Sequence, residues 1–301
     1  MRLRKKTNAF LLYLLSFIFC FQVLVYPQDS KVSLWKVTSS TSTVYLLGSI
    51  HFLTPESYPL NPSIEDAFNE CSTAIFEMNL DEAHAPEVQS MMMMKSMFQE
   101  GETLHSTLSE ETYVLADSAA KKMGLSIEQF NGFKPWFFAL YLVAQKIQRM
   151  GYNPEYGVDV YLFKRAKERE IKIEGLETAA YQIEVLDALV QENQDELLLQ
   201  TISEMDMMDR ELNDLVKAWK HGQSKKMEAI LLSSFQDYPK IYKAMLVQRN
   251  KNWMPIIETY LNKEGKTIVI VGTAHLVGPD GLVKKLINQG HVVVQLDGKK
   301  E

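Results

Sequence analysis

The chain has 301 residues and a mass of 34.6 kDa, which suffices for one large α/β domain or two small ones. Hydrophobic residues make up 46% of it and charged residues 23%, which excludes disordered, collagenous and multi-span membrane proteins. The formal net charge is −6, and four of the 32 basic residues lie in the first six positions, so the rest is more acidic still. Such a surface repels phosphate backbones, and we expect no nucleic-acid partner.

The N-terminal residues have the pattern of an export signal. Positive charges in residues 1–6 precede an apolar run over residues 9–26, and polar turn residues follow. We predict a signal peptide or an N-terminal membrane anchor over residues 1–28, because the run is long for a cleaved signal and short for a membrane span. Either form places the protein outside the cytoplasm: in the periplasm, outside the cell or anchored to a membrane.

The next part of the chain alternates between strand and helix patterns. Residues 33–37 and 43–47 are β-rich runs separated by serine and threonine, which predicts a β-hairpin. Residues 61–71 have helical apolar spacing, and residues 73–78 form a short apolar run typical of a strand.

From about residue 86 to 260 long helical periodicities dominate, interrupted by one short strand at residues 171–173. The C-terminal part returns to strands at 267–271 and 291–296 with a helix over 282–288 between them. We therefore predict an α/β fold: residues 29–301 form a single domain whose central mixed sheet comes from the N- and C-terminal halves, with a large helical insertion.

Two distant segments repeat one pattern. VYLLGSIH ends at His51 and IVIVGTAH ends at His275, and each has four apolar residues, a glycine, a small hydroxyl residue, one further residue and a histidine. Gly48 and Gly272 let the backbone turn at the carboxyl edge of a sheet, where α/β folds place their ligands. We therefore expect the two histidines to lie together above that edge, within the span of one metal ion or small ligand.

Two glutamates follow strands in a similar way. Glu77 ends the strand at 73–76, and Glu177 follows the strand at 171–173. Imidazole and carboxylate groups together suit Zn²⁺, Mn²⁺, Fe²⁺ or Co²⁺, and a bound metal ion activates water. Alternatively, one carboxylate acts as a general base without metal, or Glu77 simply pairs with a lysine.

The combination of motifs along the chain carries a family resemblance. The motifs are LWKV (34–37), YLLGSIH (45–51), IFEMNL (75–80), YGVDVYLFKRAKERE (156–170), IEGLETAAYQ (173–182), QRNKNWMPII (248–257) and VGTAHLVGPDGLVKKLINQGHVV (271–293). In this combination the chain resembles the TraB/GumN family, which is related to the Tiki proteins and the pheromone-shutdown proteins. The resemblance implies an α/β core with a metal-dependent hydrolase site made by paired histidines and glutamates. Animal members resemble metallopeptidases that cleave secreted signalling proteins, whereas many bacterial members have no assigned substrate.

The resemblance adds two residues to the candidate site. Asp159 of the YGVD motif either reaches the pocket or caps the helix that follows it. Arg249 of the QRN motif either binds a substrate carboxylate or a developing oxyanion, or bridges to Glu77 or Glu177. Ser49 stands where the family usually has threonine, and it keeps the hydroxyl group.

Our hypothesis is an exported metal-dependent hydrolase, a peptidase acting on peptide or protein substrates. His51 and His275 would bind a divalent metal (Mn, Co or Zn) together with Glu77 or Glu177, and the other glutamate would take the proton from water. The alternative is a non-catalytic protein that binds a peptide or a haem-like ligand in the same pocket. The sequence contains no signal from which an oligomeric state could be predicted.

Overall fold

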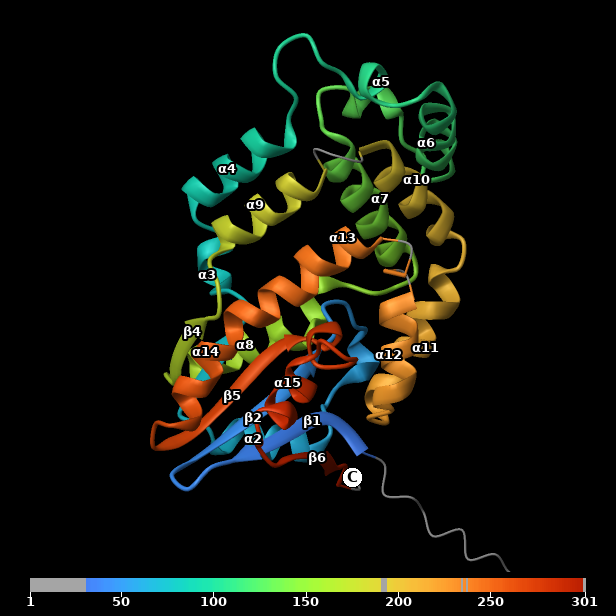
Figure 1. Cartoon of the computed structure of the whole chain (residues 1–301). Coiled ribbons are helices and arrows are strands. Elements are labelled where there is room, and N and C mark those ends of the chain that lie inside the picture. Colours follow the sequence, from blue (N-terminus) through green and yellow to red (C-terminus); the bar gives the residue numbers. More distant parts are fainter. Residues whose placement is uncertain (1–30, 191–193, 234, 237, 300–301) are drawn as a thin grey trace, which may run out of the picture. The chain divides into compact units, whose positions relative to one another are not determined.

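The computed structural model describes residues 31–190, 194–233, 235–236 and 238–299. It contains a mixed six-stranded sheet in the order β4-β3-β5-β2-β1-β6 (Figure 1). The strands are β1 (Lys31–Thr38), β2 (Ser42–Ser49), β3 (Thr73–Phe76), β4 (Lys172–Gly175), β5 (Gly265–Gly272) and β6 (Val293–Asp297). The predicted signal or anchor over residues 1–28 lies outside the described residues. Within the described residues, every helix is too short or too polar to cross a membrane.

The sheet joins the two ends of the chain, which confirms the predicted fold class. β1 and β2 form the expected antiparallel hairpin, and β6 pairs antiparallel with β1. β5, from the C-terminal half, lies parallel to both β2 and β3, and β4 is parallel to β3. β2, β3 and β5 are buried almost throughout, as expected for parallel strands with helices on both faces.

Helices connect the strands, and most of them lie in the predicted helical insertion. The α-helices are α2 (Pro62–Glu70), α3 (Leu80–Ala83), α4 (Pro86–Ser96), α5 (Leu104–Thr107), α6 (Glu110–Lys122), α7 (Pro135–Arg149), α8 (Val158–Glu168), α9 (Ala179–Val190), α10 (Gln194–Met205), α11 (Met208–Lys220), α12 (Ser224–Ser233), α13 (Pro239–Tyr242), α14 (Arg249–Leu261) and α15 (Leu282–Asn288). The other helical turns are 3₁₀ at η1 (Pro55–Ser57), η2 (Ile127–Phe130), η3 (Pro154–Tyr156) and η5 (Thr273–His275), and a π-helix at η4 (Lys243–Gln248).

The insertion contributes to two separate apolar clusters. Residues of α8, α11, α12 and α14 pack into the main core around the sheet. Residues of α5, α6, η2, α7 and α10 form a second cluster of their own. Figure 1 shows α8 and α14 beside the sheet and α5, α6 and α10 farther from it. One part of the insertion therefore packs against the sheet, and the other part forms a small helical module with its own apolar core.

Trp219 of α11 links the insertion to strands β1 and β2 through hydrogen bonds. Its indole N–H donates a hydrogen bond of 2.7 Å to the carbonyl oxygen of Gly48 in β2, and its own carbonyl accepts one of 2.9 Å from the Ser33 hydroxyl in β1. The side chain is 4% exposed, so the carbonyl of Gly48 would have no water to replace this donor.

We predict that Trp219→Phe lowers the free energy of unfolding by about 1–3 kcal/mol more than its loss of ring volume explains, because it leaves a buried carbonyl without its donor. Trp136→Phe is the matched control: Trp136 is 1% exposed, and its indole N–H has no hydrogen-bond partner among the described residues. Urea unfolding of both variants measures the difference. Equal losses in the two variants would contradict the assigned role of Trp219.

Candidate active site

The two Gly-x-x-His motifs end at neighbouring strands. Gly48 lies opposite Val271, and Ser49 lies opposite Gly272, in the parallel pair of β2 and β5. His51 lies two residues after the end of β2, and His275 ends the turn η5 that follows β5. The structure therefore brings both histidines to the carboxyl edge of the sheet, where the repeat placed them.

The two glutamates reach the same edge from the next strands. Glu77 follows β3, which neighbours β5, and Glu177 follows β4, which neighbours β3. The backbone N–H of Glu177 donates to the carbonyl oxygen of Glu77 at 2.9 Å, which extends the strand pairing and keeps both side chains side by side.

Gly272 and Gly48 permit close approach rather than a sharp turn. A β-carbon on Gly272 would lie 3.1 Å from Glu77 Oε1, 3.2 Å from His51 Nε2 and 3.8 Å from His275 Cδ2. One on Gly48 would lie 2.7 Å from Thr273 Oγ1, whose hydroxyl donates to the carbonyl oxygen of Ser49 at 2.9 Å. Glycine at these positions is therefore what allows the site residues to converge.

Arg249, the first residue of α14, lies at the centre of the buried part of the site. Its Nη2 donates to Glu77 Oε2 at 2.6 Å and to Glu177 Oε1 at 2.5 Å, and its Nε donates to Glu177 Oε1 at 2.9 Å. Trp253, one helical turn further on, donates its indole N–H to Glu177 Oε2 at 2.9 Å. The guanidinium thus bridges two buried carboxylates, as one of the two sequence-based interpretations of Arg249 proposed.

His275 is held as a neutral imidazole. Its Nδ1 donates to Asn250 Oδ1 at 2.7 Å, and its Nε2 lies 3.1 Å from Arg249 Nη1, which can only donate. Burial, assisted by the nearby charges of Arg249 and His51, lowers the pKa of His275 to about 3 despite the opposing influence of Glu77. Asn250 was not among the residues singled out from the sequence, although it stands next to Arg249 in the QRN motif.

His51 has the opposite environment. Its Nδ1 lies 3.0 Å from Asp159 Oδ2, and the Ser49 hydroxyl donates to Asp159 Oδ1 at 3.0 Å. The side chain of His51 is 48% exposed. Desolvation by itself would lower the pKa of His51, but the carboxylate of Asp159 and, more weakly, that of Glu77 outweigh it and raise the pKa to about 9.

Asp159 therefore reaches the site instead of capping its helix. The cap position of α8 is Gly157, and no side chain caps this end. Asp159 lies in the first turn, where its carboxylate faces Ser49 and His51 of the neighbouring β2 segment. The helix-capping interpretation of Asp159 is thus wrong, because the ion pair with His51 engages the side chain.

Glu77 links the two halves of the site. Its Oε1 accepts a hydrogen bond of 2.7 Å from the backbone N–H of Gly272. Burial opposes ionisation of Glu77, but the positive charges of Arg249 and His51 and the N–H of Gly272 hold its pKa below the ordinary value of a glutamate. Glu77 is therefore a carboxylate at any physiological pH.

A cavity of about 300 Å³ opens onto this arrangement. Its walls are formed by Ser49, His51, Phe52, Phe76, Glu77, Met78, Leu80, Asp159, Gln182, Ile270 and Val271. His51 and Glu77 thus face the cavity, while Arg249 and His275 lie behind Glu77 in the protein. The insertion walls the cavity only in part, through Asp159 and Gln182, and it supplies Arg249 and Glu177 to the buried layer.

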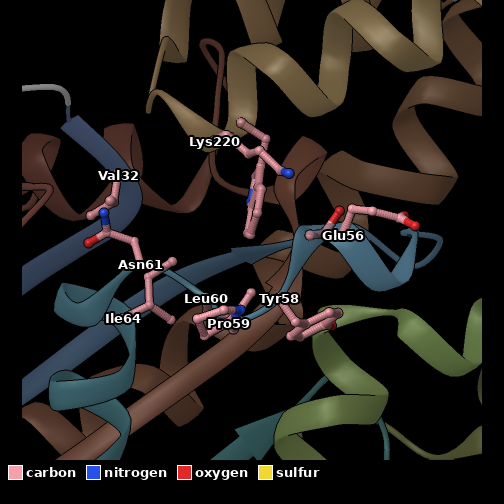
Figure 2. A pocket seen from close by; sticks show the side chains of 10 residues that line it. Val32, Glu56, Tyr58, Pro59, Leu60, Asn61, Ile64 and Lys220 are labelled. Carbon is pink, nitrogen blue, oxygen red and sulfur yellow. The ribbon is translucent and has the colours of Figure 1, made fainter. Parts of the chain in front are cut away.

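A second cavity, of about 280 Å³, contains none of the predicted site residues (Figure 2). Figure 2 shows Lys220 on one side of it and Pro59 with Leu60 on the opposite side. The indole of Trp219 also lines this cavity.

As arranged, the predicted ligands do not form a metal site. Within the described ranges, no three histidine, cysteine, aspartate or glutamate side chains converge so as to hold a metal ion. The acceptor nitrogen of His275 faces Arg249, and the same guanidinium occupies the space between Glu77 and Glu177. A divalent cation bound to Glu77 and His275 would have to displace this fixed positive charge.

Comparison with known proteins identifies the family of the chain. A profile of the TraB/PrgY/gumN family matches residues 33–295, so the chain belongs to that family. Among curated proteins it is similar to the uncharacterized protein YbaP of Escherichia coli (strain K12) and to that of Shigella flexneri. Each is 25% identical over 242 residues, which cover 80% of this chain and 87% of the relative. No solved structure gives a significant match.

We predict opposite titration behaviour for the two histidines. His51 should stay protonated up to about pH 9, and His275 should stay neutral down to about pH 3. Because the folded-state pKa of His51 exceeds its ordinary value of 6.5, its ion pair stabilises the fold fully below that pH and loses this contribution as the pH rises through 9. Nuclear magnetic resonance titration of the imidazoles measures both values, and Asp159→Asn should lower that of His51. A wild-type His51 titrating near pH 6.5 would contradict this assignment.

We further predict that Arg249→Met destabilises the protein by about 3–5 kcal/mol, because it leaves Glu77 and Glu177 buried without their counter-charge. The control is Arg210→Met, whose side chain is 91% exposed and should contribute less than about 0.5 kcal/mol. Thermal and urea unfolding of both variants give the comparison. A stability of Arg249→Met equal to that of Arg210→Met would show that the buried carboxylates do not depend on the guanidinium.

Proposed function

We propose that the domain is a hydrolase in which His51 and Glu77 act on a bond held in the cavity between them. The observation that carries the proposal is their arrangement. Both residues line one cavity, and Glu77 Oε1 and His51 Nε2 lie 3.1 and 3.2 Å from the position that a β-carbon on Gly272 would take, yet each side chain is held by a separate partner. Asp159 orients His51, and Arg249 with the N–H of Gly272 orients Glu77. Two preorganised proton-transfer groups facing one cavity are what hydrolysis needs.

The two groups have complementary protonation states. Glu77 is ionised, so its Oε1 accepts a proton from a water molecule that attacks the scissile carbonyl carbon. Protonated His51 lines the cavity and carries a second N–H at Nε2, since Nδ1 pairs with Asp159, and it donates the Nε2 proton to the departing nitrogen or oxygen. The water oxygen bonds to the carbonyl carbon as the scissile bond breaks, which leaves Glu77 protonated and His51 neutral. Glu77 then releases its proton to solvent and His51 takes one up, so both groups return to their starting states.

Arg249 is a positioning residue in this proposal. It does not line the cavity, and its donors are engaged with Glu77, Glu177, His275 and the carbonyl oxygen of Met245. Its fixed charge keeps Glu77 ionised and aimed at the cavity. The divalent Mn, Co or Zn ion stays a prediction from the sequence, and no step above passes through it because the ligands as arranged do not fit it.

Peptides or proteins are the substrate class that we propose, and export from the cytoplasm is part of the proposal. The family resemblance to peptidases supports the substrate class, and the pattern of residues 1–28 supports export. A half-exposed His51 beside a cavity that is open to solvent supports a substrate that arrives as part of a longer chain.

We predict that His51→Ala and Glu77→Gln each lower kcat/KM for any peptide the protein cleaves by roughly 100-fold or more, because each removes a proton-transfer group. His84→Ala, at an exposed position outside the site, is the control and should retain activity. A peptide library, screened with a chelator and with added Mn²⁺, Co²⁺ or Zn²⁺, supplies the substrate. Cleavage that depends on an added metal would restore the metal-dependent mechanism, and peptide binding without cleavage in every variant would identify a binding protein instead.

A further inference from the structure

The cavity beside His51 and Glu77 has walls of two kinds. Phe76 of β3 and Ile270 of β5 lie opposite one another in the sheet and so share a face, and both line the inner side of the cavity. Val271 borders it at the end of β5, and each of the three residues is only 1% exposed. Phe52, Met78 and Leu80 are partly exposed and line the cavity as well. The inner wall is therefore rigid and apolar, since it consists of buried strand residues, and the remaining apolar side chains can adapt to an occupant.

The polar groups of the cavity are already engaged with one another. Ser49 donates to Asp159, and Asp159 pairs with His51. Glu77 accepts from Gly272 and Arg249, and the side-chain amide of Gln182 lies 3.4 Å from Glu77 Oε2. Among the described residues no hydrogen bond engages Nε2 of His51, so this N–H is free to donate to an occupant of the cavity. A charged side chain placed against the apolar wall would lose its hydration and find no unpaired counter-charge, because His51 is already paired with Asp159 and Glu77 with Arg249.

The size of the cavity limits its occupant. Its volume of about 300 Å³ lies at the lower end for small-molecule sites, which run from about 300 to 1,000 Å³. It therefore accommodates one large side chain rather than several residues of a bound chain.

From this geometry we infer that the cavity is the specificity pocket of the site and accepts a single large apolar side chain, such as that of phenylalanine, leucine or methionine. The inference rests on the proposed hydrolase function. The peptide bond to be cleaved lies next to this residue, because His51 and Glu77 themselves line the pocket. A substrate with aspartate, glutamate or lysine at this position is excluded by desolvation.

The test compares two peptides that differ only in this residue, phenylalanine in one and aspartate in the other. We expect kcat/KM to be at least about tenfold higher for the phenylalanine peptide. Met78→Lys places a charge in the pocket and should reduce that preference by about tenfold or more. Met93→Lys on α4, where the methionine is 51% exposed, is the matched control and should leave the preference unchanged. Unfolding midpoints establish that both variants are folded.

A binding measurement separates this inference from the proposed function. The probes are N-acetylphenylalaninamide and N-acetylaspartamide, followed through the resonances of the His51 imidazole in the wild-type protein. Binding of the phenylalanine probe alone, without cleavage of either peptide, would uphold the pocket and overturn the hydrolase. Equal cleavage of both peptides would overturn the pocket and leave the hydrolase intact. Equal binding of both probes would also overturn the pocket, and the hydrolase then stands or falls with cleavage. Absence of both cleavage and binding would overturn both.

Discussion

The bridge from Arg249 to Glu77 and Glu177 is the interaction on which the site depends. The two carboxylates end adjacent strands, and without a cation between them their buried negative charges would repel each other. Arg249 supplies that cation from the start of α14, immediately after the π-helix η4. One side chain therefore joins the helical insertion to the sheet and fixes the direction of Glu77. It also settles the state of His275, whose acceptor nitrogen faces the same guanidinium.

Two histidines that look equivalent in the sequence have different environments in the structure, and Arg249 contacts only one of them. Both end a strand-Gly-x-x-His motif, and both lie near Gly272. His275 is nevertheless buried, neutral and tied to Asn250, whereas His51 is half-exposed, protonated and tied to Asp159. The difference arises from partners that other elements contribute, since Asn250 comes from α14 and Asp159 from α8. The two copies of the motif thus differ: His275 is part of the buried hydrogen-bond network, and His51 lines the cavity.

Local patterns predicted the strands, the hairpin and the meeting of the two motifs, because apolar periodicity and a strand-ending glycine are properties of short segments. They did not predict what fills the space between the glutamates. Arg249 could equally have faced a substrate, and the sequence contains no local signal for its distance from Glu77 or Glu177. Asp159 showed the same limit: its place in a first helical turn favoured capping, and only the approach of His51 from β2 decided otherwise. Contacts between segments that are distant in sequence determine the chemistry of the site.

The second apolar cluster, formed by α5, α6, η2, α7 and α10, has an evolutionary consequence. It is built from side chains that pack on one another, and it contains none of the residues that surround His51 or Arg249. Substitutions within it therefore change folding energy without altering the side chains at the strand ends. Selection on that module acts through stability and surface, so its sequence and length can diverge among relatives while the strand-end residues stay under chemical constraint.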